Sequence, residues 1–333
     1  MGNSSCAHDC NIGQPCGGDR IGAPPPTEAY GNAEIDGYGA ALDGNVPAAC
    51  GAGNKAHDDD LHSEAGYFMR EDSELKELKA HASGSTKERT WRRYEFKSTG
   101  SVYEGEWLGQ VRDGFGVHRW KDGAEYKGEW KDNMASGRGA FMHVDGDSYV
   151  GEWVSSSAHG KGIYRHRDLT TFMGEFNDDL QHGVGVETWP DHSKFQGDFE
   201  HGKKSGHGEY QWPDGSKYQG QWAGNQIHGV GSYFGVDGRR YEGGWQMSTM
   251  HGCGAYSWPN GRKYQGQYRL DQKHGFGIFK WADGRRYEGF WDDGRQHGLG
   301  RLYLDSGEAR LAEWREGNRH AWLEEEPPQQ PQM

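Results

Sequence analysis

The first residues of the sequence, MGNSSC, are of a kind that accepts fatty acids. Removal of Met1 would expose the amino group of Gly2, the acceptor for N-myristoylation, although the position that favours serine or threonine holds Cys6. A cysteine so close to Gly2 is a typical S-palmitoylation site, and Cys10 offers a second thiol. Two acyl chains anchor a protein stably, whereas one binds marginally. We therefore predict lipidation at Gly2, Cys6 and Cys10, with an unmodified N-terminus as the alternative.

A second set of candidate residues is basic and recurs along the second half of the chain. It consists of Lys194, Lys217, Arg239, Arg240, Arg262, Lys263, Arg285 and Arg286. A row of cations at one edge could bind anionic phosphoinositide headgroups, at about 1 kcal/mol for each cation near the surface. The alternative is a solvated turn edge, which the formal net charge of −13 favours. The same negative charge argues against nucleic-acid binding.

Other residue types that often carry chemistry predict no site. Histidines such as His159 and His182 recur 23 residues apart, which is roughly 10 Å in a sheet and too far to share a metal ion. We interpret them as repeat residues that hydrogen-bond turn backbone. The Gly-x-Gly pairs lack the following helix that a nucleotide site needs, and no P-loop, nucleophile-elbow or kinase motif is present. We expect no metal, no cofactor and no enzymatic activity.

The elements that must position these residues form a repeat. An aromatic residue returns every 23 residues, at Tyr103, Tyr126, Tyr149, Phe172, Phe195, Tyr218, Tyr241, Tyr264 and Tyr287. Each begins a string such as YEGEW, and a Gly-x-Gly follows eleven and thirteen residues later. Asp-Gly or Asn-Gly pairs, which favour hairpins, precede many repeats. The pattern predicts two short strands per repeat and an all-β fold, an elongated single-sheet antiparallel array of β-hairpins.

Alternation along the strands predicts how this thin sheet is packed. Tyr103, Gly105 and Trp107 should share one face, and Gly114, Gly116, His118 and Trp120 should share one face of the next strand. Aromatic rings would then cover the backbone that neighbouring glycines leave open. By this reasoning a side chain at Gly229 would occupy the place of a ring.

The strings YxGxW and HGxG, together with the 23-residue step, resemble the MORN repeat (membrane occupation and recognition nexus). The resemblance covers nine full repeats over residues 103–309, preceded by a half-repeat that contains Gly100 and followed by a degraded repeat with Trp314. The secreted aromatic-glycine repeats of bacterial choline- and glucan-binding modules are the alternative, but they lack HGxG. The resemblance implies a scaffold, with dimerisation through an end of the array as a further possibility.

The chain outside the array falls into segments on either side of it. We predict a disordered, acylated tail over residues 1–60, a short helical or linker segment over 61–90, the array over 91–322, and a disordered acidic, proline- and glutamine-rich tail over 323–333. Within the helical segment, Phe68, Met69, Leu75 and Leu78 form an apolar stripe expected to pack on the first hairpin. The open ends of the sheet need caps, for which residues 75–81 and 309–323 are candidates.

These features together predict a non-enzymatic scaffold at the cytoplasmic face of a membrane. Its partners would be anionic membrane lipids and proteins of a cortical or cytoskeletal assembly, with a homodimer possible. One alternative, taken from relatives of the family, is a soluble axonemal component of a flagellar spoke or cilium. Another is a regulatory subunit that docks a lipid- or phosphate-signalling enzyme on a membrane. Gly2 and Cys6 discriminate, because an axonemal role has no need of them.

Overall fold

A computed structural model describes residues 64–80 and 88–324 of the chain. Its contacts divide the chain into two compact units, with the boundary between Gly206 and His207. The N-terminal unit contains α1 (Glu64–Met69), α2 (Asp72–Ala80), β1 (Arg89–Glu95), β2 (Val102–Leu108), β3 (Val111–Arg119), β4 (Glu125–Lys131), β5 (Met134–Met142), β6 (Ser148–Val154), β7 (Ser157–Arg165), β8 (Thr171–Asn177), β9 (Leu180–Thr188) and β10 (Lys194–Glu200). The boundary falls within β11 (Lys203–Gln211).

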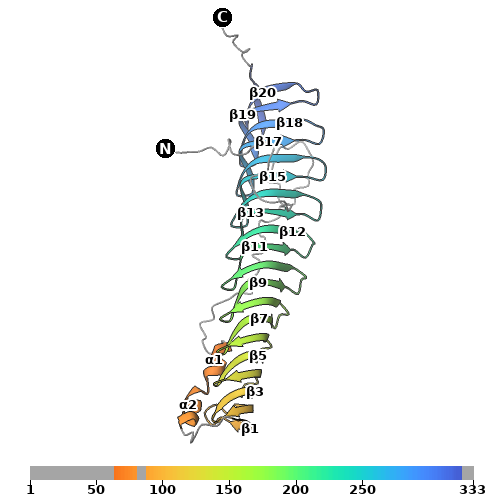
Figure 1. Ribbon diagram of the computed structural model, residues 1–333. Coiled ribbons are helices and arrows are strands. Elements are labelled where there is room, and N and C mark those ends of the chain that lie inside the picture. Colours follow the sequence, from red (N-terminus) through yellow and green to blue (C-terminus); the bar gives the residue numbers. More distant parts are fainter. Residues whose placement is uncertain (1–63, 81–87, 325–333) are drawn as a thin grey trace, which may run out of the picture. The chain divides into compact units, whose positions relative to one another are not determined.

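The C-terminal unit contains β12 (Lys217–Ala223), β13 (Gln226–Phe234), β14 (Arg240–Gln246), β15 (Thr249–Ser257), β16 (Lys263–Arg269), β17 (Gln272–Lys280), β18 (Arg286–Asp292), β19 (Arg295–Tyr303), β20 (Ala309–Arg315) and β21 (Asn318–Trp322). The 21 strands are assigned to one antiparallel sheet, and within each unit every strand pairs with the next in sequence (Figure 1). The predicted all-β fold with two strands per repeat is confirmed.

Two kinds of turn alternate along the array. Several wide turns carry the predicted Asp-Gly or Asn-Gly pairs, and Leu169 and His192 take the glycine position with positive φ in two others. In the turn between β3 and β4, Trp120 N donates to Ala124 O at 2.9 Å, and the Asp122 carboxylate accepts from Ala124 N at 3.2 Å. The tight turns have two residues, and both take positive φ at Asp132 (49°) and Asn133 (73°). This conformation matches the twist of a hairpin. The side of the array formed by the wide turns is called the wide-turn side below.

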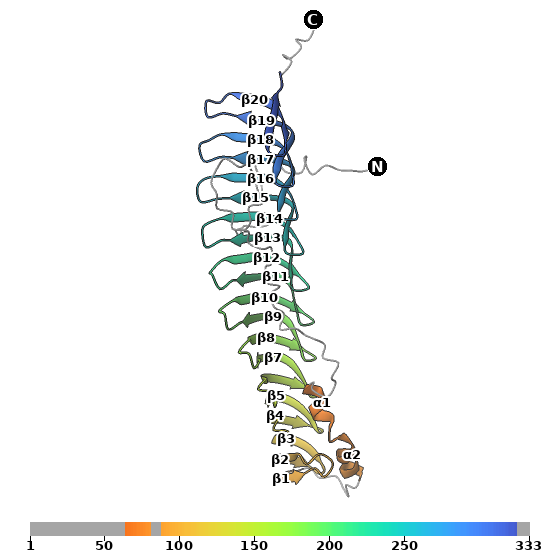
Figure 2. The same cartoon turned by 180° about the vertical axis from the view of Figure 1, so that it is seen from behind.

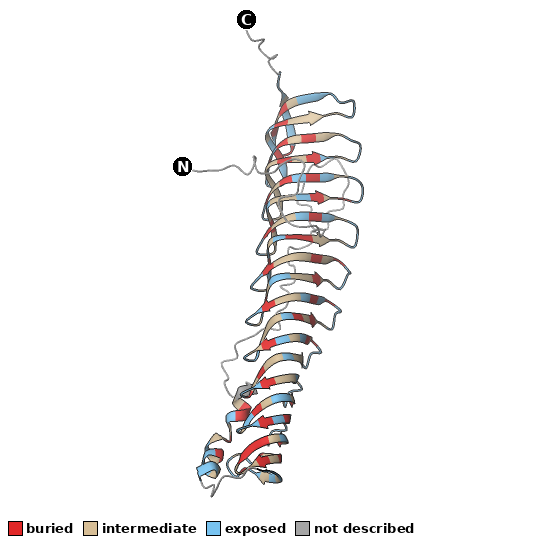
Figure 3. Cartoon of the chain, viewed as in Figure 1, coloured by how far each residue is buried: buried red, intermediate tan, exposed pale blue. Residues whose placement is uncertain are grey.

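Aromatic rings lie over glycine backbone as predicted. Tyr103 is fully buried, and a Cβ added at Gly116 would lie 2.6 Å from Cε2 of its ring and closer still to Cζ. The Tyr103 hydroxyl donates to Glu106 O at 3.1 Å. The next repeat is tied to the first by Trp130, whose indole N–H donates to Gly116 O at 3.3 Å. These contacts recur, so buried residues return at corresponding places in successive strands (Figure 3). The face that carries these rings is called the aromatic face.

The first glycine of each pair has a different role from the predicted one. Strand register shifts by a β-bulge between Gly105 and Trp107, opposite Gly114, which takes φ of +110°. A Cβ at Gly114 would lie 2.8 Å from the carboxyl carbon of Glu106, away from the tyrosine ring. The expectation that Gly114 shares the ring-covered position of Gly116 is therefore wrong. The same holds for Gly229, where a Cβ would meet the Gln221 amide.

The two helices belong to the N-terminal unit and lie beside its first strands, from β1 to β5 (Figures 1 and 2). In the predicted apolar stripe, Phe68 and Leu75 are buried, but Met69 is 65% exposed and Tyr67 is buried in its place. The carboxylate of Glu74 accepts hydrogen bonds from Tyr94, Lys97 and Ser98 at the turn between β1 and β2. The segment packs on the first hairpin through Glu74, as expected, but Phe68 reaches beyond it to rings of β4, β5 and β6.

Candidate functional site

The aromatic face carries two further columns of rings near the wide-turn side. They stand 15 and 17 residues after each repeat start, and we call them the aromatic ladder. In the C-terminal unit the ladder consists of Tyr210, Trp212, Tyr233, Tyr256, Trp258, Phe279 and Trp281. Tyr256 is directly opposite Tyr241 and Tyr264 on the neighbouring strands, which places it on the aromatic face. In the N-terminal unit the corresponding residues include Trp120, Phe141 and Trp189.

In the N-terminal unit the chain's own helical segment covers the start of this ladder. The Tyr67 ring lies 5.2 Å from Trp120 and 5.4 Å from Phe141, both edge to face. The Phe68 ring enters deeper and contacts Trp120, Tyr126, Trp130, Phe141 and Trp153 at centroid distances from 5.2 to 5.9 Å. Phe68 is 3% exposed. Adjacent aromatic residues on a short helix thus fit the aromatic face.

A buried polar cluster holds the same segment. Glu71 is fully buried and accepts a hydrogen bond from the Ser101 hydroxyl at 2.9 Å. Burial raises the pKa of its carboxyl group, against hydrogen bonds from Ser101 and Thr99 that lower it. Arg112, also fully buried, contacts His118 Nδ1 at 2.8 Å. Burial lowers the pKa of Arg112 to about 10, and burial together with Arg112 lowers the pKa of His118 well below its ordinary value.

In the C-terminal unit the rings of the ladder contact one another in two runs. Trp212 lies 4.9 Å from Tyr210 and 5.2 Å from Tyr233. The second run joins Tyr256 to Trp258 at 4.1 Å, continues to Phe279 at 5.8 Å and ends at Trp281, 4.8 Å from Phe279. Between the runs, Gly235 stands where neighbouring repeats have tryptophan. Tyr210, Tyr256, Trp258 and Phe279 are buried, whereas Trp212, Tyr233 and Trp281 are half-buried.

One donor in the second run lacks a protein partner. The indole N–H of Trp258 is buried, and within residues 64–80 and 88–324 nothing accepts a hydrogen bond from it. The ammonium of Lys273 lies over the rings of Trp258 and Phe279, at 5.6 and 5.3 Å from their centroids. This stretch of the face therefore combines buried rings with a positive charge beside them and a buried donor that has no acceptor in the described residues.

The predicted basic residues lie on two faces, not in one row. Arg262 and Arg285 belong to the aromatic face, where their guanidinium carbons lie 5.3 Å from the Trp258 ring and 5.4 Å from the Trp281 ring. Arg239 stands directly before β14, as Arg262 stands directly before β16 and Arg285 directly before β18. Because successive side chains of a strand alternate, the residue after each arginine lies on the opposite face. That second set consists of Lys194, Lys217, Arg240, Lys263 and Arg286, and we call it the opposite-face row.

Carboxylates accompany many of these cations. Arg285 Nε lies 2.7 Å from Asp283, and Arg239 pairs with Asp237. In the opposite-face row, Lys217 contacts Glu209 at 3.0 Å and Arg286 contacts Glu288 at 3.0 Å. Lys194, Arg240 and Lys263 are exposed. Local carboxylates thus reduce the positive potential that a simple count of lysines and arginines implies.

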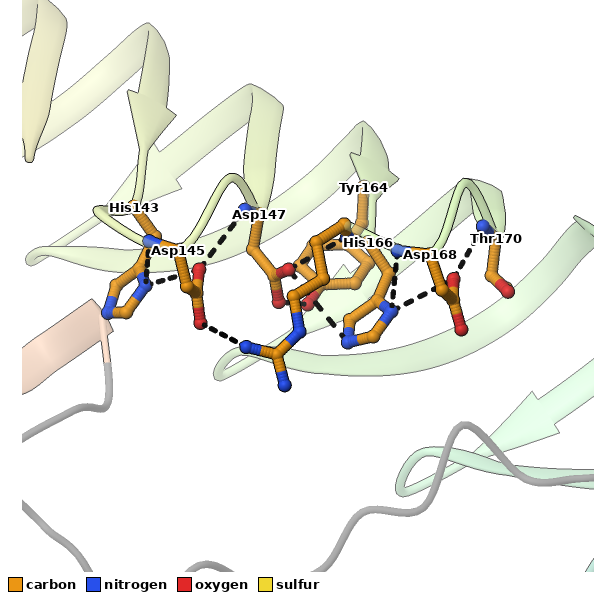
Figure 4. Close-up of polar contacts among 8 residues, drawn as sticks. His143, Asp145, Asp147, Tyr164, His166, Asp168 and Thr170 are labelled. Carbon is orange, nitrogen blue, oxygen red and sulfur yellow. Dashed lines mark hydrogen bonds and ion pairs between the residues drawn. The ribbon is translucent and has the colours of Figure 1, made fainter.

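The ladder is interrupted in the N-terminal unit by a polar cluster on the wide-turn side (Figure 4). His143 and His166 stand where other repeats have tryptophan. His143 Nδ1 contacts Asp145 at 2.5 Å, and His166 Nδ1 contacts Asp168 at 2.9 Å. A backbone hydrogen bond from Thr170, with His166 beside it, lowers the pKa of Asp168 to about 2. These contacts satisfy the turns locally and bring no third ligand to a metal position.

The remaining predictions concern the acylation residues, the repeat histidines, metal binding and membrane spans. Gly2, Cys6 and Cys10 lie outside the described residues. In the repeat histidines His159, His182 and His251, Nδ1 is buried without a hydrogen-bond partner in the described part of the chain. That same part contains no cluster of histidine, cysteine or carboxylate side chains able to hold a metal ion. None of its helices is long and apolar enough to cross a membrane.

Comparison with known proteins identifies the repeat. The MORN repeat family matches nine consecutive segments, at residues 103–125, 126–148, 149–171, 172–194, 195–217, 218–238, 241–261, 264–285 and 287–308. The prediction of nine such repeats is thereby confirmed. No curated protein matches the sequence.

Two solved structures show weaker likeness. One is the TCP10 domain of Danio rerio CPAP in complex with a STIL peptide, with 14% identity, 65% of this chain and 97% of that chain covered, and a TM-score of 0.39. The other is the SAS-4 TCP domain of Drosophila melanogaster with a proline-rich motif of Ana2, with 14% identity, 54% and 90% coverage, and a TM-score of 0.30. Both scores are too low to identify a shared fold or function.

Proposed function

The chain belongs to the MORN-repeat family, a scaffold-type repeat, and we propose that it is a non-enzymatic scaffold whose aromatic ladder holds short segments of partner proteins. The packing of Tyr67 and Phe68 supports this proposal most directly, because these two residues belong to a short segment that binds on the aromatic face within the same chain. Aromatic anchors in desolvated pockets carry much of the energy in protein interfaces. Partners with comparable aromatic anchors fit the ladder of the C-terminal unit.

The second part of the proposal is membrane attachment through acyl chains on Gly2 and Cys6, with Cys10 as a further acceptor. A single myristoyl chain gives an association constant of about 10⁴ per molar, and each additional buried CH₂ adds about 0.8 kcal/mol. Dual acylation would therefore hold the array at the cytoplasmic face of a membrane. The four segments of the chain, at 1–60, 61–90, 91–322 and 323–333, would act as acylated tail, linker, array and second tail.

An array tethered in this way would organise a cortical or cytoskeletal assembly. A soluble component of an axoneme or cilium is the first alternative, and a subunit that docks a signalling enzyme on a membrane is the second. Pairing of two copies through an end of the array would double the number of ladders. The opposite-face row would make the contacts with anionic lipids, because Arg239, Arg262 and Arg285 lie along the ladder.

Fractionation tests the membrane part of the proposal. The Gly2→Ala protein should become soluble, because palmitoylation requires prior membrane contact, and Cys6→Ser should leave weak, transient binding. A Gly2→Ala protein that stays wholly in the membrane pellet would transfer targeting to the repeats and overturn acylation as the anchor.

Site-specific crosslinking tests the scaffold part. A photo-reactive amino acid at position 262 faces the ladder, and the same group at position 263 faces the other side of the sheet. We expect discrete protein adducts from position 262 and few from position 263, in otherwise identical full-length chains in cells. Equal adducts from the two positions would show that the ladder is not the preferred docking surface.

A further inference from the structure

The face opposite the aromatic face carries a run of apolar side chains in the N-terminal unit. The run occupies one column of five consecutive strands, β5 to β9, and consists of Ala140, Val150, Ile163, Met173 and Val186. Each of these residues is the direct cross-strand partner of the next, so their side chains form one continuous surface. Val150 and Met173 are 47% and 53% exposed. We call this surface the apolar strip.

The composition of the same column elsewhere shows that the apolar strip is a local departure. Val150 and Met173 directly follow the first residue of their repeats. In the other repeats that position is polar, as Glu104, Lys127, Gln196, Gln219, Glu242, Gln265 and Glu288. Polar residues are what a sheet face in contact with water requires. An exposed apolar surface rimmed by polar residues marks an interaction site, so the apolar strip indicates that another molecule covers this part of the face.

A row of alternating charges lies beside the apolar strip, one column closer to the tight turns. It consists of Arg138 on β5, Glu152 on β6, Lys161 on β7 and Glu175 on β8, and we call it the charge row. Arg138 is directly opposite Glu152, and Lys161 is directly opposite Glu175. The side chains of Arg138 and Lys161 are exposed and form no ion pair within the described residues. Because the charge row is neutral as a whole, neither an anionic membrane nor a nucleic acid suits it.

We propose that the apolar strip and the charge row form the interface of a homodimer, in which β5–β8 of two copies pack face to face. A two-fold axis parallel to the strands, between β6 and β7, relates the copies. It places Val150 on Ile163 of the second copy and Glu152 on Lys161 of the second copy. This inference goes beyond the proposed function, because the dimer leaves both aromatic faces free for partner segments.

The order of the charges favours this position of the axis. The axis brings β5 onto β8 of the second copy, so Arg138 meets Glu175 and all four members of the charge row face an opposite charge. An axis through β7 would instead place Glu152 on Glu175 and Lys161 on its own counterpart. Like-charge contacts of this kind suppress wrong pairings at interfaces. The charge row is therefore complementary to a reversed copy of itself.

The size of the surface fits a reversible dimer. With strands about 4.8 Å apart and residues about 3.3 Å apart along a strand, six strands by seven residues give a footprint of roughly 650 Å². A stable interface of standard size buries about 800 Å² per partner. The six strands are β4–β9, and at their edge the hydrocarbon stem of Lys127 would cover Val186 of the second copy. Two twisted sheets pack face to face with their strands within about 30°, which the axis permits.

Sedimentation velocity of the purified full-length chain tests the dimer. Between roughly 1 and 100 µM, where an interface of this size dissociates, the chain should pass from monomer to dimer. Val150→Glu should weaken the dimer at least about tenfold, because it places an unpaired charge in the apolar strip. Val230→Glu is the matched control, since Val230 lies on the same face in the C-terminal unit and is 46% exposed. It should dimerise like the wild-type chain.

Charge exchange tests the position of the axis. Glu152→Lys and Lys161→Glu should each weaken the dimer, because each places like charges opposite one another. An equimolar mixture of the two variants should form a heterodimer, since every contact between them again joins opposite charges. The double variant in one chain should dimerise like the wild type. Other repeats hold Gln221 and Gly244 at the position of Glu152, so the fold tolerates substitution there, and circular dichroism spectra verify that each variant folds.

The inference is overturned if the wild-type chain stays monomeric at the highest concentration, or if Val150→Glu and Val230→Glu dimerise equally. The second result would assign pairing to another surface, such as an end of the array. Failure of the mixture and of the double variant to restore the dimer would also overturn it. Each of these results can coexist with crosslinking of partners from position 262, so failure of the dimer is distinguishable from failure of the scaffold function.

Discussion

Replacement of Gly231 by alanine tests the packing that holds the array together. Gly231 is the second glycine of its pair, and it lies under the ring of Tyr218. An added Cβ would stand 2.5 Å from Cζ and 2.6 Å from Cε2 of that ring. The ring cannot move aside easily, because it is fully buried and contacts Trp222 and Trp245 at centroid distances of 5.6 and 5.4 Å.

Two effects set the magnitude of the loss. Overpacking of a buried site costs about 1–3 kcal/mol. Displacement of the ring would also break the hydrogen bond from the Tyr218 hydroxyl to Gln221 O, at 3.1 Å, which contributes about 0.5–1.5 kcal/mol. We therefore expect Gly231→Ala to lower the free energy of unfolding by about 2–4 kcal/mol. No backbone strain adds to this, because Gly231 does not have a positive φ.

The neighbouring Gly229 is the matched control. Its φ of +79° makes alanine cost roughly 1–2 kcal/mol through backbone strain, while its added Cβ would meet the flexible Gln221 side chain. In a Tyr218→Ala background, Gly231→Ala should become nearly neutral and Gly229→Ala should keep its cost. Urea unfolding gives the free energies, and hydrogen exchange in β12 to β14 localises them, since repeat arrays open locally. Additive effects of Tyr218→Ala and Gly231→Ala would refute the ring-over-glycine account.

Three further contacts or groups of residues can be tested. Burial acts to raise the pKa of Glu74, but hydrogen bonds from Ser98, Lys97 and Tyr94 lower it to about 2. The stability that the Glu74 carboxylate contributes is complete above the pKa of the unfolded state and is lost as the pH falls through about 2. The Ser98 amide resonance should therefore titrate in acid in the wild-type chain and should not do so in Glu74→Gln. Lys204 and Glu187 are both buried and 2.6 Å apart, so Lys204→Met should cost about 3–5 kcal/mol in urea unfolding, and adding Glu187→Leu should recover most of it. Replacing the opposite-face row by serine should abolish salt-dependent binding to anionic liposomes, whereas serine at Arg239, Arg262 and Arg285 should not; equal effects, or a wild-type chain that ignores such liposomes at low salt, would reject that row as a lipid site.

The repeated part of the fold could be predicted because one packing rule recurs at a fixed interval. Tyr103, Gly105 and Trp107 alternate with polar residues, and alternation sets which side chains share a face. Asp122 and Gly123 mark a turn that recurs with the same hydrogen bonds in later repeats. Strand number, pairing and the ring-over-glycine contact all follow from these local signals.

Features that depend on three-dimensional detail could not be predicted in the same way. The β-bulge that turns Gly114 away from the rings is set by a shift in pairing between strands, which alternation along one strand does not reveal. The tight turns have unrelated sequences, such as Asp132–Asn133 and Met247–Ser248, and share only positive φ. Burial of Tyr67 in place of Met69 depends on which rings of the sheet the helix meets. The division of the arginine pairs between two faces was accessible, since adjacent residues of a strand point to opposite sides.

The location of the candidate site follows from how the repeats differ. Rings such as Tyr218 and glycines such as Gly231 are fixed by packing, so those columns have little room for functional variation. Positions 15 and 17 residues after each repeat start vary instead, from Tyr256 and Trp258 to Tyr164 and His166. Because each repeat contacts chiefly its neighbours, such changes alter the surface locally without disturbing the sheet. Selectivity for a docked segment should therefore depend on which consecutive repeats combine a tryptophan with a following arginine, and Trp258 and Trp281 are consecutive repeats that do so.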